Sequence, residues 1–180
     1  MRKPYADRYA FRLRMTTGVF MDANDFSNDR LTYSALCSTG SNKVRLGGKF
    51  VKIKIDEGSK KGLHKIKLNQ VFGVRTCKNT YRIQDGLDYK VINTKYISLY
   101  SRLIEIGAEG SFYEDLYYFS ATPEGRIQPL TKRNLKDAYP SNSEFVNYID
   151  KSFKDDSELG VFNSQLNQYM LVYFFEKSKN

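Results

Sequence analysis

The sequence predicts an α+β protein, in which an antiparallel β-meander, curled or barrel-like, precedes two to three C-terminal helices. Short runs that alternate polar and apolar residues, separated by turn residues, fill most of 15–130. Helical apolar spacing with capping residues is found in 131–177. The chain also has 14 tyrosines and 12 phenylalanines among its 180 residues, and both types favour sheets. Because this length is ordinary for one core, we expect a single domain over 1–180.

The first segments alternate short strands with polar turns. Residues 1–14 are basic and aromatic, and they are expected to form a flexible arm or a first strand. Two strands are expected at 16–21 and 31–37, on either side of a polar turn or single helical turn at 22–30.

The most one-sided segment is 43–68, which has nine basic and two acidic side chains. Gly47 and Gly48 separate two alternating runs, 43–46 and 49–55, and predict a two-residue hairpin turn. Successive side chains of a strand point to opposite faces, so the lysines of 49–55 and of the next strand, 64–68, should share a basic face. The candidate anion-binding residues are Arg45, Lys52, Lys54, Lys65 and Lys67, helped by Arg75 and Arg82. The alternative is a solvated sheet face, since lysine is common on exposed and edge strands.

The meander continues to about residue 130. Strands are expected at 70–76, 80–84, 88–93 and 96–103. A loop at 105–115 and a hairpin that turns at 123–125 should follow.

Capping residues predict the helices. Thr131 should cap a helix at 132–139, and Ser141 with Glu144 forms a capping box for a helix that ends near Phe153. A last helix is expected from about 160 to 177, although its apolar run MLVYFF is also compatible with a strand.

The positive charge is concentrated in the middle of the chain. The formal net charge is +9, but residues 43–95 alone contain 14 basic and 4 acidic side chains, which gives +10. A local basic surface attracts anions, such as nucleic acid, anionic lipid, acidic polysaccharide or an acidic protein.

No catalytic or metal motif stands out. His64 is the only histidine, and it lies in a predicted strand without a motif that would pair it with a nucleophile. Asp25, Ser27 and Asp29 place oxygen atoms at alternate positions, as a calcium loop does, but the glycine and the final carboxylate of that loop are missing. We therefore favour a protein that is not an enzyme and has no cofactor. An enzyme that uses His64 or the acidic turn is the alternative, and these three residues are kept as weak metal candidates.

Cys37 and Cys77 leave two alternatives open. In an oxidising compartment they could form a disulfide, worth roughly 3–4 kcal/mol for a loop of this size. In a reducing compartment they would be buried thiols. No apolar run is long enough for a transmembrane helix. No signal peptide is visible, because the basic N-terminal residues lack an apolar stretch.

Several segments together resemble an uncharacterised family of small Bacteroidetes proteins. They are GVFMDANDF, LTYSAL, KIKLNQVFGVRTCKNTYRI, DYKVINTKYISLY, YYFS and GRIQPLTKRNLKDAYP. The resemblance implies an exported protein, periplasmic or secreted, with no assigned activity. It transfers no catalytic residue. A cytoplasmic location remains the alternative, since the chain shows no export signal.

Two hypotheses of function follow. The first is a non-enzymatic binding or structural domain of the bacterial envelope, whose partner is unknown. The second is a domain that binds a polyanion, nucleic acid or acidic glycan, through the lysine-rich face.

Overall fold

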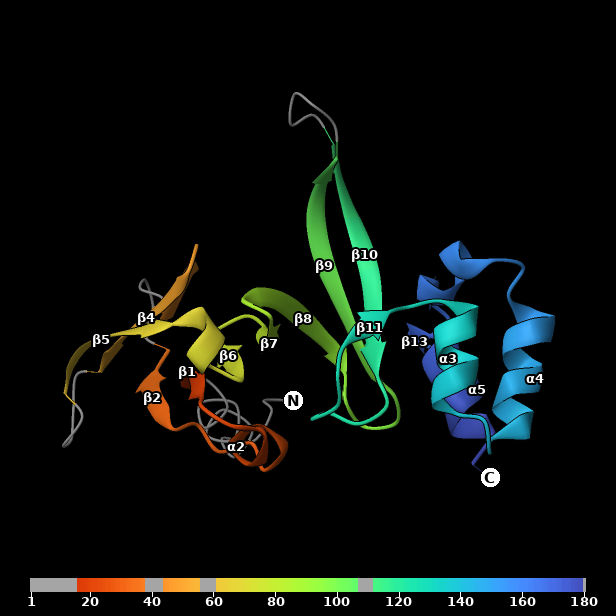
Figure 1. Ribbon diagram of the computed structural model, residues 1–180, viewed down its shortest axis with the longest axis horizontal. Helices are drawn as coiled ribbons and strands as arrows, with labels where there is room; N and C mark the ends of the chain where they lie inside the picture. Colours follow the sequence, from red (N-terminus) through yellow and green to blue (C-terminus); the bar gives the residue numbers. More distant parts are fainter. Residues whose placement is uncertain (1–15, 38–43, 56–60, 107–111, 180) are drawn as a thin grey trace, which may run out of the picture. The chain divides into compact units, whose positions relative to one another are not determined.

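The computed structural model describes residues 16–37, 44–55, 61–106 and 112–179. The chain, drawn in Figure 1, divides into two compact units, Met1–Lys90 (unit 1) and Val91–Asn180 (unit 2). Each unit has its own hydrophobic core. The predicted class is confirmed, because antiparallel strands come first and helices follow at the C-terminus. The sheets that the described strands form are open and are not closed into a barrel. The single domain over 1–180 stays a prediction, and the expected arm at 1–14 lies outside the described residues.

Unit 1 contains an antiparallel sheet with the strand order β2-β1-β6-β7-β8. Its strands are β1 (Thr16–Phe20), β2 (Tyr33–Leu36), β6 (Gly73–Arg75), β7 (Thr80–Gln84) and β8 (Leu87–Asn93), whose last three residues belong to unit 2. The short helix α2 (Ala23–Ser27) connects β1 to β2 and begins after Asp22, whose side chain accepts a hydrogen bond from the Asp25 backbone N–H at 2.8 Å. An aspartate at this position satisfies a backbone donor that the helix leaves unpaired.

A second antiparallel sheet of unit 1 has the order β3-β4-β5. Its strands are β3 (Val44–Gly47), β4 (Phe50–Ile55) and β5 (Gly62–Lys67), and the 3-10 turn η1 (Leu68–Gln70) follows. The predicted hairpin is present, but its turn is Gly48-Lys49, because Gly47 pairs with Phe50. Only Gly48 has a positive φ, +55°, so one glycine meets the need of the turn.

The apolar faces of both sheets build the core of unit 1. Val51, Ile53 and Ile55 of β4 alternate with lysines and are buried together with Val19 of β1 and Val74 of β6. Alternation therefore works as predicted: one face of β4 joins the core and the other stays exposed.

Unit 2 begins with a long hairpin of β9 (Ser98–Ile106) and β10 (Phe112–Ser120). The prediction of a loop at 105–115 was wrong for 105–106, which belong to β9, and for 112–115, which belong to β10; residues 107–111 lie outside the described residues. Four consecutive side chains of this segment, from Phe112 to Asp115, are all exposed and show no alternation, so pairing with β9 rather than burial makes it a strand. The strand β11 (Gln128–Pro129) pairs with β10 over two residues only.

Two of the predicted helices are present with small differences. Thr131 caps α3 (Lys132–Ala138) as expected. Helix α4 (Ser143–Ser152) is capped by the Asn142 side chain, which accepts from the Phe145 N–H at 3.0 Å, rather than by Ser141. The apolar stripe of α4 is buried as predicted: Phe145 and Ile149 are 0% exposed and Phe153 is 4% exposed.

The last helix is shorter than predicted. Helix α5 (Met170–Lys177) contains the MLVYFF run, so the strand alternative is wrong. The segment before it forms η2 (Asp156–Gly160) and the small hairpin β12 (Phe162–Asn163) and β13 (Gln168–Tyr169). Asn163 explains the difference, because its side chain accepts from the N–H groups of Gln165 and Leu166 and bends the chain.

Within the described ranges, none of the helices has the length and apolar character that a membrane crossing requires.

Candidate anion-binding face

The outward face of the β3-β4-β5 sheet carries five basic side chains, which we call the basic face. They are Arg45, Lys52, Lys54, Lys65 and Lys67, all of them exposed. The strands β3, β4 and β5 contain no acidic residue. The structure therefore gathers five of the seven predicted anion-binding residues on one surface.

Three of these residues form a row across the sheet. Arg45 is paired with Lys52, and Lys52 is paired with Lys65, so the three side chains are direct neighbours on adjacent strands. Directly opposite side chains in an antiparallel pair have Cβ atoms about 4.5–5.5 Å apart, and like charges there are destabilising. Among the described residues, no carboxylate lies within 4.0 Å of Arg45, Lys52 or Lys65. The row is thus a concentrated positive charge that an anion would neutralise.

Phe50 shares the basic face, since it lies two residues before Lys52 on β4. The Lys65 Nζ lies 4.1 Å from the centroid of its ring, a cation–π contact. Beside Phe50 is a hollow of about 320 Å³, lined by Lys49, Phe50, Lys67, Leu68, Asn69 and Gly86. Phe50 was not among the residues predicted from the sequence, although its position in the alternation places it with the lysines. Asn69 and Gly86 come from other elements and gave no local signal.

Arg75 and Arg82 do not belong to the basic face, because they lie on the other sheet of unit 1, in β6 and β7. Arg75 forms an ion pair with Asp29 and contacts the Phe20 ring. Arg82 is 6% exposed, and its guanidinium donates a hydrogen bond to the Phe72 carbonyl oxygen. The Cζ atom of Arg82 also lies 3.3 Å from the centroid of the Phe72 ring. Both arginines interact with other residues of unit 1, and neither adds its positive charge to the basic face.

The acidic turn is also occupied by internal contacts. Asp25 is 6% exposed and forms an ion pair with Arg30 at 2.6 Å. Asp29 pairs with Arg75, and Ser27 is the last residue of α2. The described residues contain no group of three or more His, Cys, Asp or Glu side chains that is placed to hold a metal ion. The two carboxylates are therefore bound to arginines in this structure.

His64 lies on the inner side of β5, and its ring contacts Tyr33 with centroids 5.1 Å apart. The half-buried imidazole thus packs against a residue of the other sheet of unit 1, which is a structural role.

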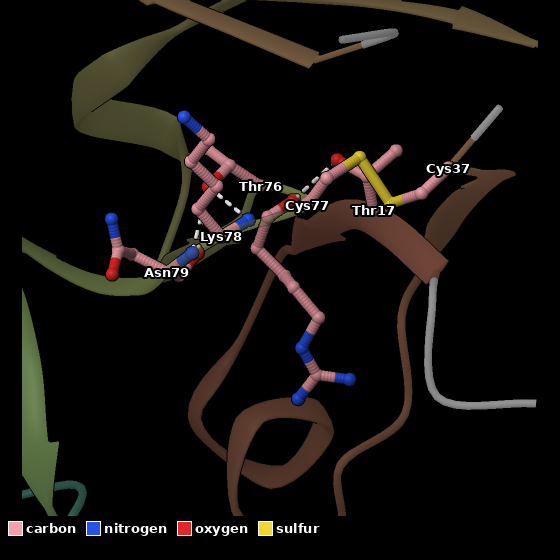
Figure 2. The surroundings of a disulfide bond; sticks show 7 residues. Thr17, Cys37, Thr76, Cys77, Lys78 and Asn79 are labelled. Atoms are coloured by element: carbon pink, nitrogen blue, oxygen red, sulfur yellow. Dashed lines mark hydrogen bonds between the residues drawn. A yellow bond between two sulfur atoms is a disulfide. The ribbon is translucent and has the colours of Figure 1, made fainter. Parts of the chain in front are cut away.

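The structure joins Cys37 to Cys77 through a disulfide, with the two Cα atoms 5.7 Å apart (Figure 2). Cys37 follows β2, and Cys77 lies in the turn between β6 and β7, so the bond spans the intervening strand β1. Thr76 orders this turn, because its hydroxyl donates to the Asn79 carbonyl oxygen and accepts from the Asn79 N–H, both at 3.0 Å. Of the two alternatives that the sequence left open, a disulfide or two buried thiols, the structure has the disulfide.

Comparison with protein-family models, curated proteins and solved structures gave no match for this chain. The arrangement of its own residues therefore carries the functional argument.

Proposed function

We propose that this protein is a non-enzymatic binding domain of the bacterial envelope and that it binds a polyanion through the basic face. The row of Arg45, Lys52 and Lys65 is the observation that carries the proposal. A sheet that needed only solubility could alternate lysine with acidic or neutral partners across its strands. Three like charges side by side cost stability, and a polyanion that binds along the row would offset this cost.

The disulfide supports the location. Disulfides persist in oxidising compartments such as the bacterial periplasm or the cell exterior, and they are rare in the cytosol. The Cys37–Cys77 bond therefore agrees with the export that the family resemblance implies.

The test is retention on heparin and on single-stranded DNA columns across a salt gradient. The variant Lys52→Glu/Lys54→Glu/Lys65→Glu reverses the centre of the basic face. Its control is Lys78→Glu/Lys90→Glu/Lys151→Glu, three exposed lysines on other elements. Each Lys→Glu change subtracts two charges, so both variants have a net charge of +3 instead of +9.

We expect the face variant to elute at much lower salt than the wild type and the control variant to elute close to it. On single strands, the loss of three contacts should flatten the slope of log K against log salt by about 2. Equal elution of both variants would mean that only the net charge matters and would refute the proposal. Circular dichroism verifies that the variants are folded.

A further inference from the structure

The hollow beside Phe50 lies at one end of the basic face, and its walls have a defined chemistry. Lys49 belongs to the β3–β4 turn, Lys67 ends β5, and Asn69 belongs to η1. The Leu68 N–H donates to the Lys49 carbonyl oxygen at 2.9 Å and fixes these segments to one another. Ligand pockets range from about 300 to 1,000 Å³, so about 320 Å³ has room for one or two small rings.

The lining selects for a ligand that is both anionic and ring-shaped. Lys49 and Lys67 supply two ammonium groups, Phe50 and Leu68 supply apolar surface, and the Asn69 amide supplies a donor and an acceptor. No carboxylate is among the lining residues that the structure describes. A sugar ring that carries a carboxylate or sulfate has a negative charge, an apolar C–H side and hydroxyl groups. These match the ammonium groups, the apolar surface and the amide of the lining, in that order.

The same face is poorly suited to a nucleic acid strand. Single-strand binders stack successive bases on several aromatic side chains. Phe50 is the one aromatic residue on the outward side of the described strands β3, β4 and β5, so this face offers a single stacking position.

We propose that this hollow is a subsite for one acidic sugar unit of a glycan, whose further anionic groups extend along the basic face. Lys49 and Lys67 bind the carboxylate or sulfate, Phe50 packs against the sugar ring, and Asn69 binds a hydroxyl group. The inference rests on the proposed function, because the subsite continues the surface that binds the polyanion.

The experiment separates the subsite from the rest of the face. Asn69→Trp fills the hollow without a change of charge, and Gln70→Trp, at the next exposed position of η1 and outside the lining, is its control. Lys67→Met removes one ammonium group of the subsite and keeps the side-chain stem. Isothermal titration calorimetry measures binding of a heparin tetrasaccharide, an oligogalacturonate, a neutral dextran oligomer and a short oligothymidylate.

We expect the wild type to bind at least one of the acidic oligosaccharides at least tenfold more tightly than dextran and oligothymidylate. Asn69→Trp and Lys67→Met should each weaken that binding at least tenfold, whereas Gln70→Trp should leave it unchanged. Unchanged affinity in Asn69→Trp, or tighter binding of oligothymidylate than of either acidic oligosaccharide, would overturn the subsite. If long heparin is still retained by the wild type and lost in the Lys52/Lys54/Lys65 variant, the proposed function stands even when the subsite fails.

Discussion

At the scale of single residues, the same side chains that suit a polyanion oppose the stability of the free protein. Lys52 has Arg45 on one side and Lys65 on the other. Its contribution to binding and its contribution to folding should therefore have opposite signs. Functional surfaces often carry such a local conflict, and it can be measured with one substitution.

We expect Lys52→Gln to raise the free energy of unfolding by about 0.5 kcal/mol at low salt, because it removes the repulsion between Lys52 and its two cross-strand neighbours, Arg45 and Lys65. The gain should shrink at high salt, where exposed charges are screened. Heparin affinity should fall in the same variant. Urea unfolding at two salt concentrations measures the effect, with Lys90→Gln on β8 as the control. A loss of stability at low salt would contradict the repulsion that we infer.

Tyr139 illustrates a second effect at the residue scale. Burial, and to a smaller extent the nearby Tyr100, raises the pKa of the Tyr139 hydroxyl to about 12. In the unfolded chain a tyrosine ionises near pH 10. The folded state thus keeps Tyr139 neutral while the unfolded state loses its proton, and stability falls as the pH rises from about 10 through about 12.

We therefore expect Tyr139→Phe to lose less stability than the wild type between pH 10 and pH 12. At pH 7 it should cost only about 0.5–1 kcal/mol, for the weak hydrogen bond to the Ala121 carbonyl oxygen. Urea unfolding across this pH range tests the expectation. Tyr113→Phe, at a side chain that is 64% exposed, is the matched control and should follow the wild type. If the wild type and Tyr139→Phe lost the same amount of stability between pH 10 and pH 12, this would contradict the role of Tyr139.

At the scale of elements, the β9–β10 hairpin has two different halves. Near its base, Leu99 and Phe119 are 0% exposed and pack in the core with the helices of unit 2. Its far half extends beyond these helices (Figure 1), and there Leu103 is 61% and Phe112 is 73% exposed. One continuous strand, β10, therefore contains both core and surface phenylalanines.

We expect Phe119→Ala to cost about 3–5 kcal/mol, the usual loss for a phenylalanine removed from a packed core. Phe112→Ala should change stability by no more than about 0.5 kcal/mol, as exposed positions usually do. Denaturant unfolding of both variants measures the difference within one strand. A similar cost at both positions would mean that the far half of the hairpin is packed in solution.

The elements also show how far sequence patterns reach. The alternation in 49–55 predicted both a strand and its faces, because the period of two is a property of the strand itself. The last helix was predicted from about 160 because Phe162, Leu166, Tyr169 or Met170, and Tyr173 recur at helical spacing in the sequence. In the structure, however, Phe162 and Leu166 are 49% and 45% exposed. Regular spacing of apolar residues is not sufficient evidence of a helix when nothing buries that side.

At the scale of the whole molecule, the disulfide belongs to unit 1 alone, and each unit has a separate core. Cross-linking across 40 residues should stabilise unit 1 by roughly 3–4 kcal/mol, mainly by restricting its unfolded state. The effect on unit 2 depends on whether the two units unfold together.

We expect Cys37→Ser/Cys77→Ser to increase amide hydrogen exchange in peptides of the β1, β2, β6 and β7 strands. Exchange in α3, α4 and α5 should stay close to that of the wild type. Mass spectrometry of both proteins after exchange measures the two groups of peptides in one experiment, and reduction of the wild type should reproduce the variant. An equal increase in both units would instead favour the single cooperative domain that the sequence predicted.

The sequence by itself determined that most strands precede the C-terminal helices, and it determined the two faces of β4 and β5, the cap of α3 and the concentration of charge between residues 43 and 95. These features depend on side-chain periodicity and on neighbours close in sequence, so they can be read without the fold. Only the tertiary structure decided that Arg45, Lys52 and Lys65 align in one row and that Arg75 and Arg82 are taken up by internal partners. It also decided that β1 lies between β2 and β6, that a disulfide joins Cys37 to Cys77, and that three separate segments line the hollow beside Phe50. Strand register and long-range packing set these positions, and both arise from contacts between residues far apart in the chain, which no local pattern specifies.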